Sequence, residues 1–396
     1  MASASTVLKP IFGTVGAVVG LYIAFIGLLT IPTFQDHVIF LHKVTLTWFQ
    51  DVSIPEQWGF LRNQVTPFHL TTADGETLHA WHILPLDTYR QNLDGLRAEP
   101  TGLRNDIKET LSFKLLKDDP SARLILYFHG AAGTLGSGFR PPSYRAISAA
   151  SPNVHILAID YRGFGTSTGW PSEAGLLSDA LALANFALDT AGIPPERIAI
   201  FAQSLGTAVA ISLTHHLALQ SPPTLFAGHV LVAPFANVEL LTETYKVAGT
   251  VPLLSPIAFF PSLLALLNKF IKPKFPSKDT LASTIRHCHS LELKHKTKYD
   301  LTIIHAEDDY DIPWLHSEIV FWHAVNATRN ENDAYTFDEL HSVNSKRKTG
   351  LGAGGWEVEW RTDDGIIREQ IVKHGLHDRI MSYSIVSLAI ARIYES

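Results

Sequence analysis

Ser204 stands in a sequence setting that is typical of a catalytic nucleophile. The segment Ala202-Gln-Ser-Leu-Gly206 follows an apolar run and precedes a stretch with helical pattern. Small residues two positions before and after the serine permit a sharp turn that lifts the hydroxyl above a sheet, at the N-terminus of a helix. The short motif alone is weak, and its first small residue is Ala202 where glycine is usual. The strand and helix patterns around it make Ser204 our candidate nucleophile.

A second feature could stabilise the negative charge that forms when a serine attacks a carbonyl group. His129-Gly-Ala-Ala-Gly133 directly follows the apolar run Leu124–Phe128. A tetrahedral intermediate needs two fixed N–H donors for its oxyanion. We expect the backbone N–H groups of Ala131 and Leu205 to fill this role. The alternative is a glycine-rich turn that only ends a strand.

A nucleophilic serine also needs a base, and the base needs an acid to orient it. When the serine lies on a strand–turn–helix motif of this kind, the acid and then the histidine follow it along the chain. Downstream, the apolar run Leu301–Ile304 opens into an acidic loop, and from this loop we select Asp309 as the acid. Asp308 and Asp311 remain alternatives, each more typical of a turn or surface carboxylate.

The base is expected after the last predicted strand. His377 lies just past a turn that contains Gly375, so a loop can direct its ring back toward the serine. His374 is the alternative, although its position favours the exposed end of the strand.

The elements that must position these residues alternate between strand and helix patterns. Short continuous apolar runs are typical of buried parallel strands, and the stretches Ser172 to Thr190 and Leu205 to Leu219 have helical pattern. The alternation predicts an α/β fold with a mostly parallel, doubly wound sheet and helices on both faces. The predicted parallel strands are Leu124–Phe128, Val154–Ile159, Arg197–Phe201, Gly228–Ala233 and Leu301–Ile304.

Two hairpins are predicted at the ends of this region. Val65–Leu70 and Leu78–Ile83 flank an Asp-Gly turn, and Trp356–Trp360 and Ile366–Val372 flank another. We expect residues 86–120 to be a polar, irregular insertion.

Two further insertions are expected within the predicted α/β region. Asn237 to Lys298 has an apolar centre that carries no charge from Val247 to Asn268. A second transmembrane helix is conceivable there, but three prolines favour a segmented lid over the active site. Thr328 to Gly355 is polar and is expected to be a surface loop.

The N-terminus has the pattern of a membrane anchor. Its apolar part, Ile11 to Ile31, would span roughly 30 Å as a helix, which matches the hydrocarbon core of a bilayer. A cleaved signal peptide is the alternative, but no small-x-small cleavage site ends the run. We therefore divide the chain into a membrane anchor (1–35), a connector (36–64) and a catalytic domain (65–396) whose cap insertion covers about 237–298.

Other patterns exclude several classes of function. The net charge is −6 and no basic stripe indicates a nucleic-acid partner. Arg286-His-Cys-His289 has no second ligand pair at a spacing that suits a metal, and the glycines at 350–355 lead into a strand where a phosphate loop would lead into a helix. Asn326-Ala-Thr328 is a glycosylation sequon. We expect no metal or organic cofactor, and the sequence does not indicate an oligomeric state.

Taken in order, the motifs resemble those of the α/β-hydrolase-domain proteins, in particular the branch of membrane-anchored monoacylglycerol and lysophosphatidylserine lipases. The resemblance covers about Val65 to the C-terminus, and Ala202 and the long polar stretch before the last hairpin depart from it. It implies hydrolysis of lipid esters, usually at endoplasmic reticulum membranes with a lumenal catalytic domain. The motifs that carry it are His129–Thr134, Asp160–Ser167, Gln203–Thr207 and His305–Asp309.

The sequence therefore predicts a serine hydrolase of single-chain lipid esters, with monoacylglycerols or lysophospholipids as substrates. Ser204 would attack the ester carbonyl, His377 would take its proton and Asp309 would hold the imidazole. The Ala131 and Leu205 amides would bind the oxyanion, and water would release the acyl group. An acyl-protein thioesterase or serine peptidase on the same fold is one alternative, and a membrane scaffold without activity is another.

Overall fold

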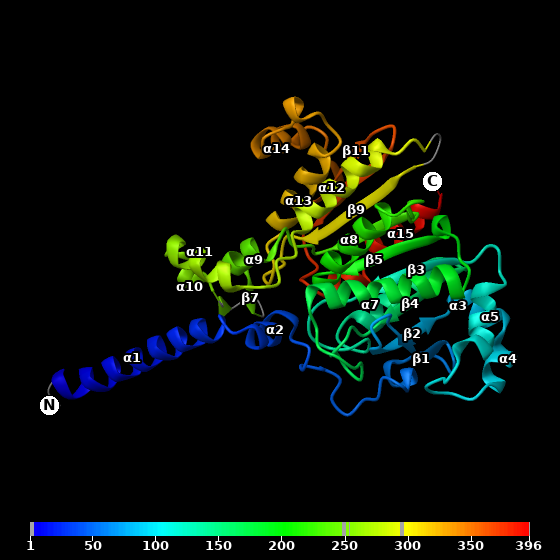
Figure 1. Ribbon diagram of the computed structural model, residues 1–396, viewed down its shortest axis with the longest axis horizontal. Coiled ribbons are helices and arrows are strands. Elements are labelled where there is room, and N and C mark those ends of the chain that lie inside the picture. Colours follow the sequence, from blue (N-terminus) through cyan, green and yellow to red (C-terminus); the bar gives the residue numbers. More distant parts are fainter. Residues whose placement is uncertain (1–3, 248–250, 253, 294–296, 396) are drawn as a thin grey trace.

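A ten-stranded sheet runs through the molecule in the order β1-β2-β4-β3-β5-β6-β9-β12-β11-β10, with helices on both of its faces (Figure 1). The computed structural model describes residues 4–247, 251–252, 254–293 and 297–395. The central strands pair in parallel and both edges are antiparallel, so the sheet is mixed.

The parallel strands coincide with the predicted apolar runs, with a sixth strand added from the last hairpin. Every residue of β4, β5 and β9 is buried. Burial on both faces explains why these strands are continuous apolar runs without alternation. The strands are β3 (Arg123–Phe128), β4 (Val154–Ile159), β5 (Ile198–Gln203), β6 (Gly228–Val232), β9 (Tyr299–Ala306) and β12 (Gly365–Val372).

Both predicted hairpins are confirmed at the two edges of the sheet. β1 (Val65–Thr71) pairs with β2 (Thr77–Ile83), and β11 (Gly355–Arg361) pairs with β12. A short strand that the sequence did not suggest, β10 (Thr349–Gly352), forms the outer edge beside β11.

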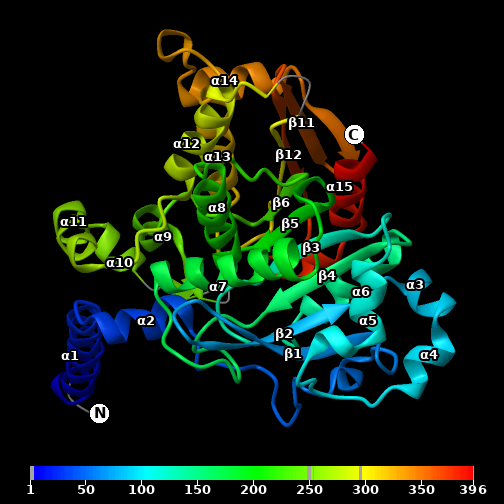
Figure 2. The same cartoon turned by 45° about the vertical axis from the view of Figure 1, so that its right-hand side comes forward.

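Helices cover the two faces of the sheet and enclose two separate apolar cores. α7 (Glu173–Asn185), α8 (Leu205–Ala218), α12 (Ser277–Ser290) and α13 (Leu315–Asn326) pack on one face. α6 (Arg140–Ala150) and α15 (Ser384–Glu395) pack on the other (Figures 1 and 2). The predicted helices at 172–190 and 205–219 are thus confirmed, the first continuing as a π-helical turn over Phe186–Thr190.

The predictions for two polar segments were wrong, because both contain helices. Residues 86–120 hold α3 (Leu86–Gln91), α4 (Leu93–Ala98) and α5 (Leu111–Lys117). Each helix buries so few apolar side chains that no helical period shows in the sequence. The predicted surface loop at 328–355 holds α14 (Phe337–Ser345) and β10.

The start of α14 carried a signal that we missed. Thr336 and Glu339 form a capping box, each bonding the other's backbone N–H. Just before it, the sequon residue Asn326 donates from Nδ2 to the Tyr335 carbonyl and accepts from the Tyr335 N–H. The folded chain therefore uses the amide that a glycan would occupy. The remaining short helical turns are Pro55–Trp58, Ile107–Glu109, Pro195–Arg197, Glu331–Asp333 and Arg379–Ser382.

The N-terminal helix α1 (Ala4–Leu28) projects away from the sheet, and α2 (Pro32–Phe40) turns back onto the domain (Figure 1). Among the residues that the structure describes, no single helix is long and apolar enough to cross a membrane. Gly13–Leu28 and Pro32–Phe40 meet that criterion together, with a bend of 103° between them.

The predicted lid is segmented, and its helices lie on the same side of the molecule as α1 (Figures 1 and 2). Prolines stand in the first turns of both α10 and α11. Part of the uncharged stretch lies outside the described residues. α12, which we had included in the insertion, packs along α8 and α13 as part of the layer over the sheet. The lid elements are α9 (Val238–Thr244), β7 (Lys246–Val247), β8 (Val251–Pro252), α10 (Ser255–Ala258) and α11 (Pro261–Phe270).

Candidate active site

Ser204 occupies a strained turn between β5 and α8. Its φ of 52° and ψ of −121° are values that residues with a side chain rarely adopt, and such strain is concentrated at functional sites. The turn requires small neighbours. A Cβ atom on Gly206 would lie 2.2 Å from the Phe128 carbonyl oxygen, so α8 can approach β3 only because this residue is glycine. Ala202 fits in place of the usual glycine, fully buried opposite Phe128 in the sheet.

The structure brings Ser204, His377 and Asp309 into one chain of hydrogen bonds. His377 Nε2 lies 2.9 Å from Ser204 Oγ, and His377 Nδ1 lies 2.7 Å from Asp309 Oδ2. Because a carboxylate can only accept, Nδ1 carries a hydrogen, and in the neutral form of the ring the lone pair of Nε2 faces the serine hydroxyl.

Two of the alternatives left open by the sequence, His374 and Asp308, lie outside this chain of hydrogen bonds. The His374 side chain is 75 % exposed, and its Nδ1 lies 3.4 Å from an Asp308 oxygen. Asp308 accepts the N–H groups of Gly375 and Leu376, so it holds the loop that carries His377. The residue of this loop in the left-handed region is Leu376, with φ 50°.

Both carboxylate oxygens of Asp309 accept hydrogen bonds. Oδ1 accepts the N–H groups of Asp311 and Ile312, and Oδ2 receives His305 Nε2 at 3.0 Å as well as His377. His305 is itself held by Ser317 Oγ, 2.5 Å from Nδ1. Burial favours the neutral carboxyl, but the charge of His377 and the bonds from both histidines outweigh it and hold the pKa of Asp309 well below its usual range.

The Asp309 carboxylate also raises the pKa of His377. Burial alone would lower the pKa of His377, but the negative charge and hydrogen bond of Asp309 outweigh it and raise this pKa to about 9. The carboxylates of Asp378 and Asp311 add to the rise.

Arg140 holds the loop that carries Ala131. Its guanidinium group donates to the carbonyl oxygens of Gly130 (3.0 Å), Ala131 (3.2 Å), Ala132 (2.7 Å) and Thr134 (2.6 Å). With the carbonyls turned toward Arg140, the Ala131 N–H is free to face the other way. In the part of the chain that the structure describes, neither the Ala131 nor the Leu205 amide has a hydrogen-bond acceptor, and both residues line the same cavity. This role of Arg140 is not evident from the sequence, because an arginine at the start of a helix is usually a surface residue.

The connector after α2 braces this loop from the other side. The Phe40 carbonyl accepts the Ala132 N–H at 3.0 Å, the Val44 carbonyl accepts the Gly133 N–H at 2.5 Å, and Ser137 Oγ donates to the Thr45 carbonyl at 2.7 Å. The buried Gln35 then joins α2 to the lid. It donates to the Leu29 and Phe270 carbonyls and accepts the Lys272 N–H. Residues just after the predicted anchor therefore form part of the site, which nothing in the sequence indicated.

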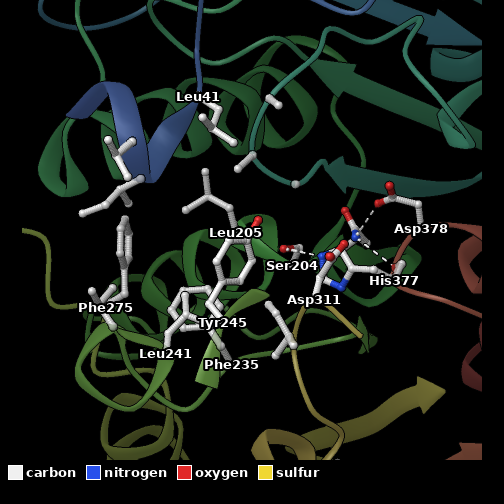
Figure 3. A pocket seen from close by; sticks show the side chains of 18 of the residues that line it. Leu41, Ser204, Leu205, Phe235, Leu241, Tyr245, Phe275, Asp311, His377 and Asp378 are labelled. Atoms are coloured by element: carbon white, nitrogen blue, oxygen red, sulfur yellow. Dashed lines mark hydrogen bonds between the residues drawn. The ribbon is translucent and has the colours of Figure 1, made fainter. Parts of the chain in front are cut away.

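A cavity of about 270 Å³ opens beside Ser204. Figure 3 shows that Leu41, Leu241 and Phe275 lie to one side of the serine, and that His377, Asp311 and Asp378 lie to the other. α2, the lid and the loop before α6 all contribute to its wall. Its apolar lining comprises Leu29, Val38, Ile39, Leu41, Leu46, Phe139, Leu205, Phe235, Val238, Leu241, Leu254, Ile271, Phe275, Ile312 and Met381.

A metal site is not apparent. Within residues 4–395, apart from the gaps named above, no group of three or more His, Cys, Asp or Glu side chains is placed to hold a metal ion. His287 and His289, which flank Cys288, point to different partners, the Ala218 carbonyl and Asp364.

Comparison with known proteins identifies the family. Residues 125–328 match the model described as the alpha/beta hydrolase family. The chain belongs to this family. The fold and the hydrolase class that the motifs suggested are thereby confirmed.

Several relatives of this α/β hydrolase carry the name lysophosphatidylserine lipase ABHD12. The Macaca fascicularis protein is 30 % identical over 82 % of this chain and 72 % of its own length. The Xenopus tropicalis protein is 31 % identical over 74 % and 67 %, and the Rattus norvegicus protein is 30 % identical over 75 % and 65 %. The chain thus spans about two thirds of the length of these relatives.

Among solved structures, an alpha-beta hydrolase from Vibrio vulnificus superposes with a TM-score of 0.52. The alignment covers 91 % of this chain and 92 % of that one at 14 % identity, a likeness that supports the fold alone.

Arg140 offers a test of how the loop is positioned. We expect Arg140→Met to lower kcat for a p-nitrophenyl ester by about 10- to 100-fold with little change in KM, because the Ala131 amide loses its fixed direction. Arg145→Met is the matched control. Arg145 lies on the same helix but donates to the Trp58 carbonyl, away from the loop. Equal kcat values in the two variants, both folded by circular dichroism, would contradict this role for Arg140.

The raised pKa of His377 predicts how the rate depends on pH. A histidine that takes a proton from Ser204 has to be neutral, and the neutral fraction grows as pH rises through its pKa. We therefore expect kcat/KM to rise from pH 6, to reach half of its maximum near pH 9, where half of His377 is neutral, and to level off about one pH unit higher. Asp309 stays ionised over this range because its pKa is lowered. A profile already flat at pH 6 would show that Asp309 does not raise the pKa of the base.

Proposed function

We propose that the protein is a serine hydrolase that cleaves carboxylic esters of single-chain lipids through Ser204, His377 and Asp309. The observation that carries the proposal is the hydrogen-bond chain from Asp309 through His377 to Ser204, which ends at the wall of a largely apolar cavity.

The proposed reaction follows from the position of each group. Ser204 Oγ attacks the ester carbonyl while its proton passes to His377 Nε2. Asp309 stabilises the imidazolium, and the N–H groups of Ala131 and Leu205 donate to the oxyanion. As the intermediate collapses, His377 returns the proton to the departing alcohol and the acyl group stays on Ser204. Water then attacks the acyl-enzyme by the same route and restores the serine.

The cavity supports a lipid substrate. On the Leu41, Leu241 and Phe275 side its wall is apolar, as an acyl chain requires. Each buried methylene contributes roughly 0.8 kcal/mol, so a long chain would bind several kcal/mol more tightly than a short ester. The relatives named lysophosphatidylserine lipases also favour a lipid ester over a peptide or a thioester.

Membrane attachment through the N-terminus belongs to the same proposal. Several apolar side chains of α1 between Gly13 and Leu28 are exposed, Leu21 to 72 % and Ile23 to 65 %. Phe259, at the end of α10, is 84 % exposed, and α10 lies on the same side of the molecule as α1 (Figures 1 and 2). Such apolar surface favours insertion into a bilayer. We propose residues 1–35 as a single-pass anchor in the endoplasmic reticulum membrane, 36–64 as connector and 65–396 as the catalytic domain.

The role of the proposed triad can be measured directly. Ser204→Ala and His377→Ala should each lower kcat for a monoacylglycerol by about 10³-fold or more, since nucleophile and base act as a unit. Ser204→Ala should also abolish labelling by a fluorophosphonate. His374→Ala serves as the control and should keep most of the activity. An inactive His374→Ala with an active His377→Ala would contradict our choice of base. A wild type that takes up no label would favour a scaffold without activity.

The anchor has its own test. The full chain, expressed in a eukaryotic cell, should remain in the membrane pellet after washing with alkaline carbonate, because an inserted helix resists extraction. Replacing Val18, Leu21 and Ile23 with aspartate should release the protein into the supernatant. Release of the wild type under the same conditions would exclude a membrane-spanning segment.

A further inference from the structure

A second histidine contacts the proposed triad. His305 is the next-to-last residue of β9 and is fully buried, and its Nε2 lies 3.0 Å from Asp309 Oδ2. His377 Nδ1 lies 2.7 Å from the same oxygen. Two imidazole rings therefore meet at one carboxylate oxygen, although the proposed reaction uses only one of them as a base.

The neighbours of His305 decide which of its ring nitrogens carries a hydrogen. Nε2 lies 3.0 Å from both Asp309 Oδ2 and the Ile312 carbonyl oxygen, and these two atoms can only accept. Nε2 therefore carries a hydrogen. In the neutral form of the ring, Nδ1 accepts the hydrogen of Ser317 Oγ, which lies 2.5 Å away. Because Ser317 is fully buried on α13, it holds the ring in the tautomer that donates to Asp309.

The Asp309 carboxylate has its acceptor positions filled. An ionised carboxylate offers about four lone-pair sites. Oδ1 accepts the backbone N–H groups of Asp311 and Ile312, and Oδ2 receives the two histidines. Among the residues that the structure describes, only His305 holds Oδ2 in addition to the base itself. Without His305, the orientation of this oxygen would depend on His377 alone.

The hydrogen bond from His305 also affects how strongly Asp309 attracts the proton of the base. Burial favours the neutral carboxyl, but the charge of His377 and the hydrogen bonds from both histidines outweigh it, so the pKa of Asp309 lies well below its usual range. An oxygen that is already stabilised by one donor is a weaker acceptor for the next. Two N–H groups directed at one oxygen also repel each other. For both reasons we expect His305 to lower the pKa of His377 and to keep more of the base neutral.

Other titratable groups face this cluster from the elements packed around it. Burial lowers the pKa of His316, on α13, to about 4, and burial raises the pKa of Tyr245, at the end of α9, to about 12. Both groups therefore stay neutral between about pH 6 and pH 10. The carboxylates of Asp311 and Asp378 favour the protonated form of the proposed base. A variant of His305 leaves all four groups in place, so a changed pH profile reports on His305 itself.

We propose that His305 is a positioning residue for the proposed triad. Held by Ser317, it directs the Asp309 carboxylate toward the base and limits how strongly this carboxylate stabilises the protonated form. His305 is not among the residues that line the cavity, so it acts through Asp309 and not on the substrate. The role rests on the proposed function, because it is exerted through the triad.

Leucine and glutamine at position 305 test the donor. Glutamine can place an N–H donor near the position of the histidine Nε2, whereas leucine fills a similar space without a donor. With p-nitrophenyl butyrate and the full-length enzyme, His305→Leu should lower the plateau kcat by about 10- to 100-fold with little change in KM, because the carboxylate loses its fixed orientation. The pH of half-maximal kcat/KM should rise by about half a unit, since Asp309 then attracts the proton of His377 more strongly. His305→Gln should keep kcat within about threefold of the wild type, with the wild-type pH midpoint, because the donor is restored.

His229→Leu is the matched control. His229 lies near the start of β6, the strand beside β9, and its Nε2 lies 2.8 Å from Thr214 Oγ1, away from the carboxyl ends of the strands where the triad lies. This variant also removes a strand histidine and its hydrogen bond, but it should keep the wild-type kcat and pH midpoint. Equal losses in His305→Leu and His229→Leu would assign the effect to a weakened sheet and would overturn the proposal. Equal losses in the two His305 variants would overturn it as well, because the donor would then not matter, and so would a wild-type kcat and pH profile in His305→Leu.

Ser317→Ala tests the same arrangement and remains informative if His305→Leu does not fold. It removes the hydroxyl that holds the tautomer and leaves the ring of His305 in place. We expect kcat to fall by about three- to tenfold and the pH midpoint to move upward, because the ring is then less firmly held as a donor. A wild-type kcat and midpoint in Ser317→Ala would overturn the role of the Ser317–His305 pair.

Ser204→Ala separates this inference from the proposed function. If the wild type hydrolyses p-nitrophenyl butyrate and Ser204→Ala does not, while His305→Leu behaves as the wild type, only the role of His305 is refuted. If hydrolysis does not depend on Ser204, the proposed function is refuted, and the role of His305 is refuted with it.

Discussion

The site depends on the close contact between α8 and β3, which holds Ser204 in its strained turn. At Gly206 the helix backbone comes so near the Phe128 carbonyl that no side chain fits between them. This contact keeps the serine at φ 52° and directs its hydroxyl to the end of the sheet where β9 and β12 also end. Because neighbouring parallel strands end at the same edge, loops far apart in the chain can bring Asp309 and His377 to the same hydroxyl.

The loop that carries Ala131 is held from two sides by groups that have no part in the proposed chemistry. Arg140 draws its carbonyl oxygens inward, and the backbone at Phe40 and Val44 accepts the next two amides. Since Phe40 lies at the end of α2, the segment that follows the proposed anchor also sets the geometry of the loop that carries Ala131. Gln35 extends this connection to the lid. Movement of the N-terminal helices relative to the domain would therefore change the geometry of the active site.

The cavity beside Ser204 is apolar on the side of Leu41, Leu241 and Phe275 and polar on the side of His377. In the proposed reaction the apolar wall would bind the acyl chain of a lipid ester. The negative charge and hydrogen bond of Asp309, with smaller contributions from Asp378 and Asp311, favour the protonated form of His377, so the base becomes neutral only toward alkaline pH.

The sequence by itself determined the central sheet, the hairpins at both of its edges and the family. Continuous apolar runs and Asp-Gly turns are local signals, and strands buried on both faces can hardly be built from other residues. It also indicated Ser204, since the turn there requires small residues at fixed spacing. It favoured Asp309 over Asp308 and Asp311, and His377 over His374, but it could not exclude the alternatives, because adjacent residues of one loop differ only in the direction that the folded backbone gives them. Helices with few buried side chains, such as α3 to α5, were not predicted because their sequences show no helical period of apolar residues. The tertiary structure alone decided the roles of Arg140, Gln35 and the connector, because their partners are backbone groups, and a backbone carbonyl leaves no mark in the sequence.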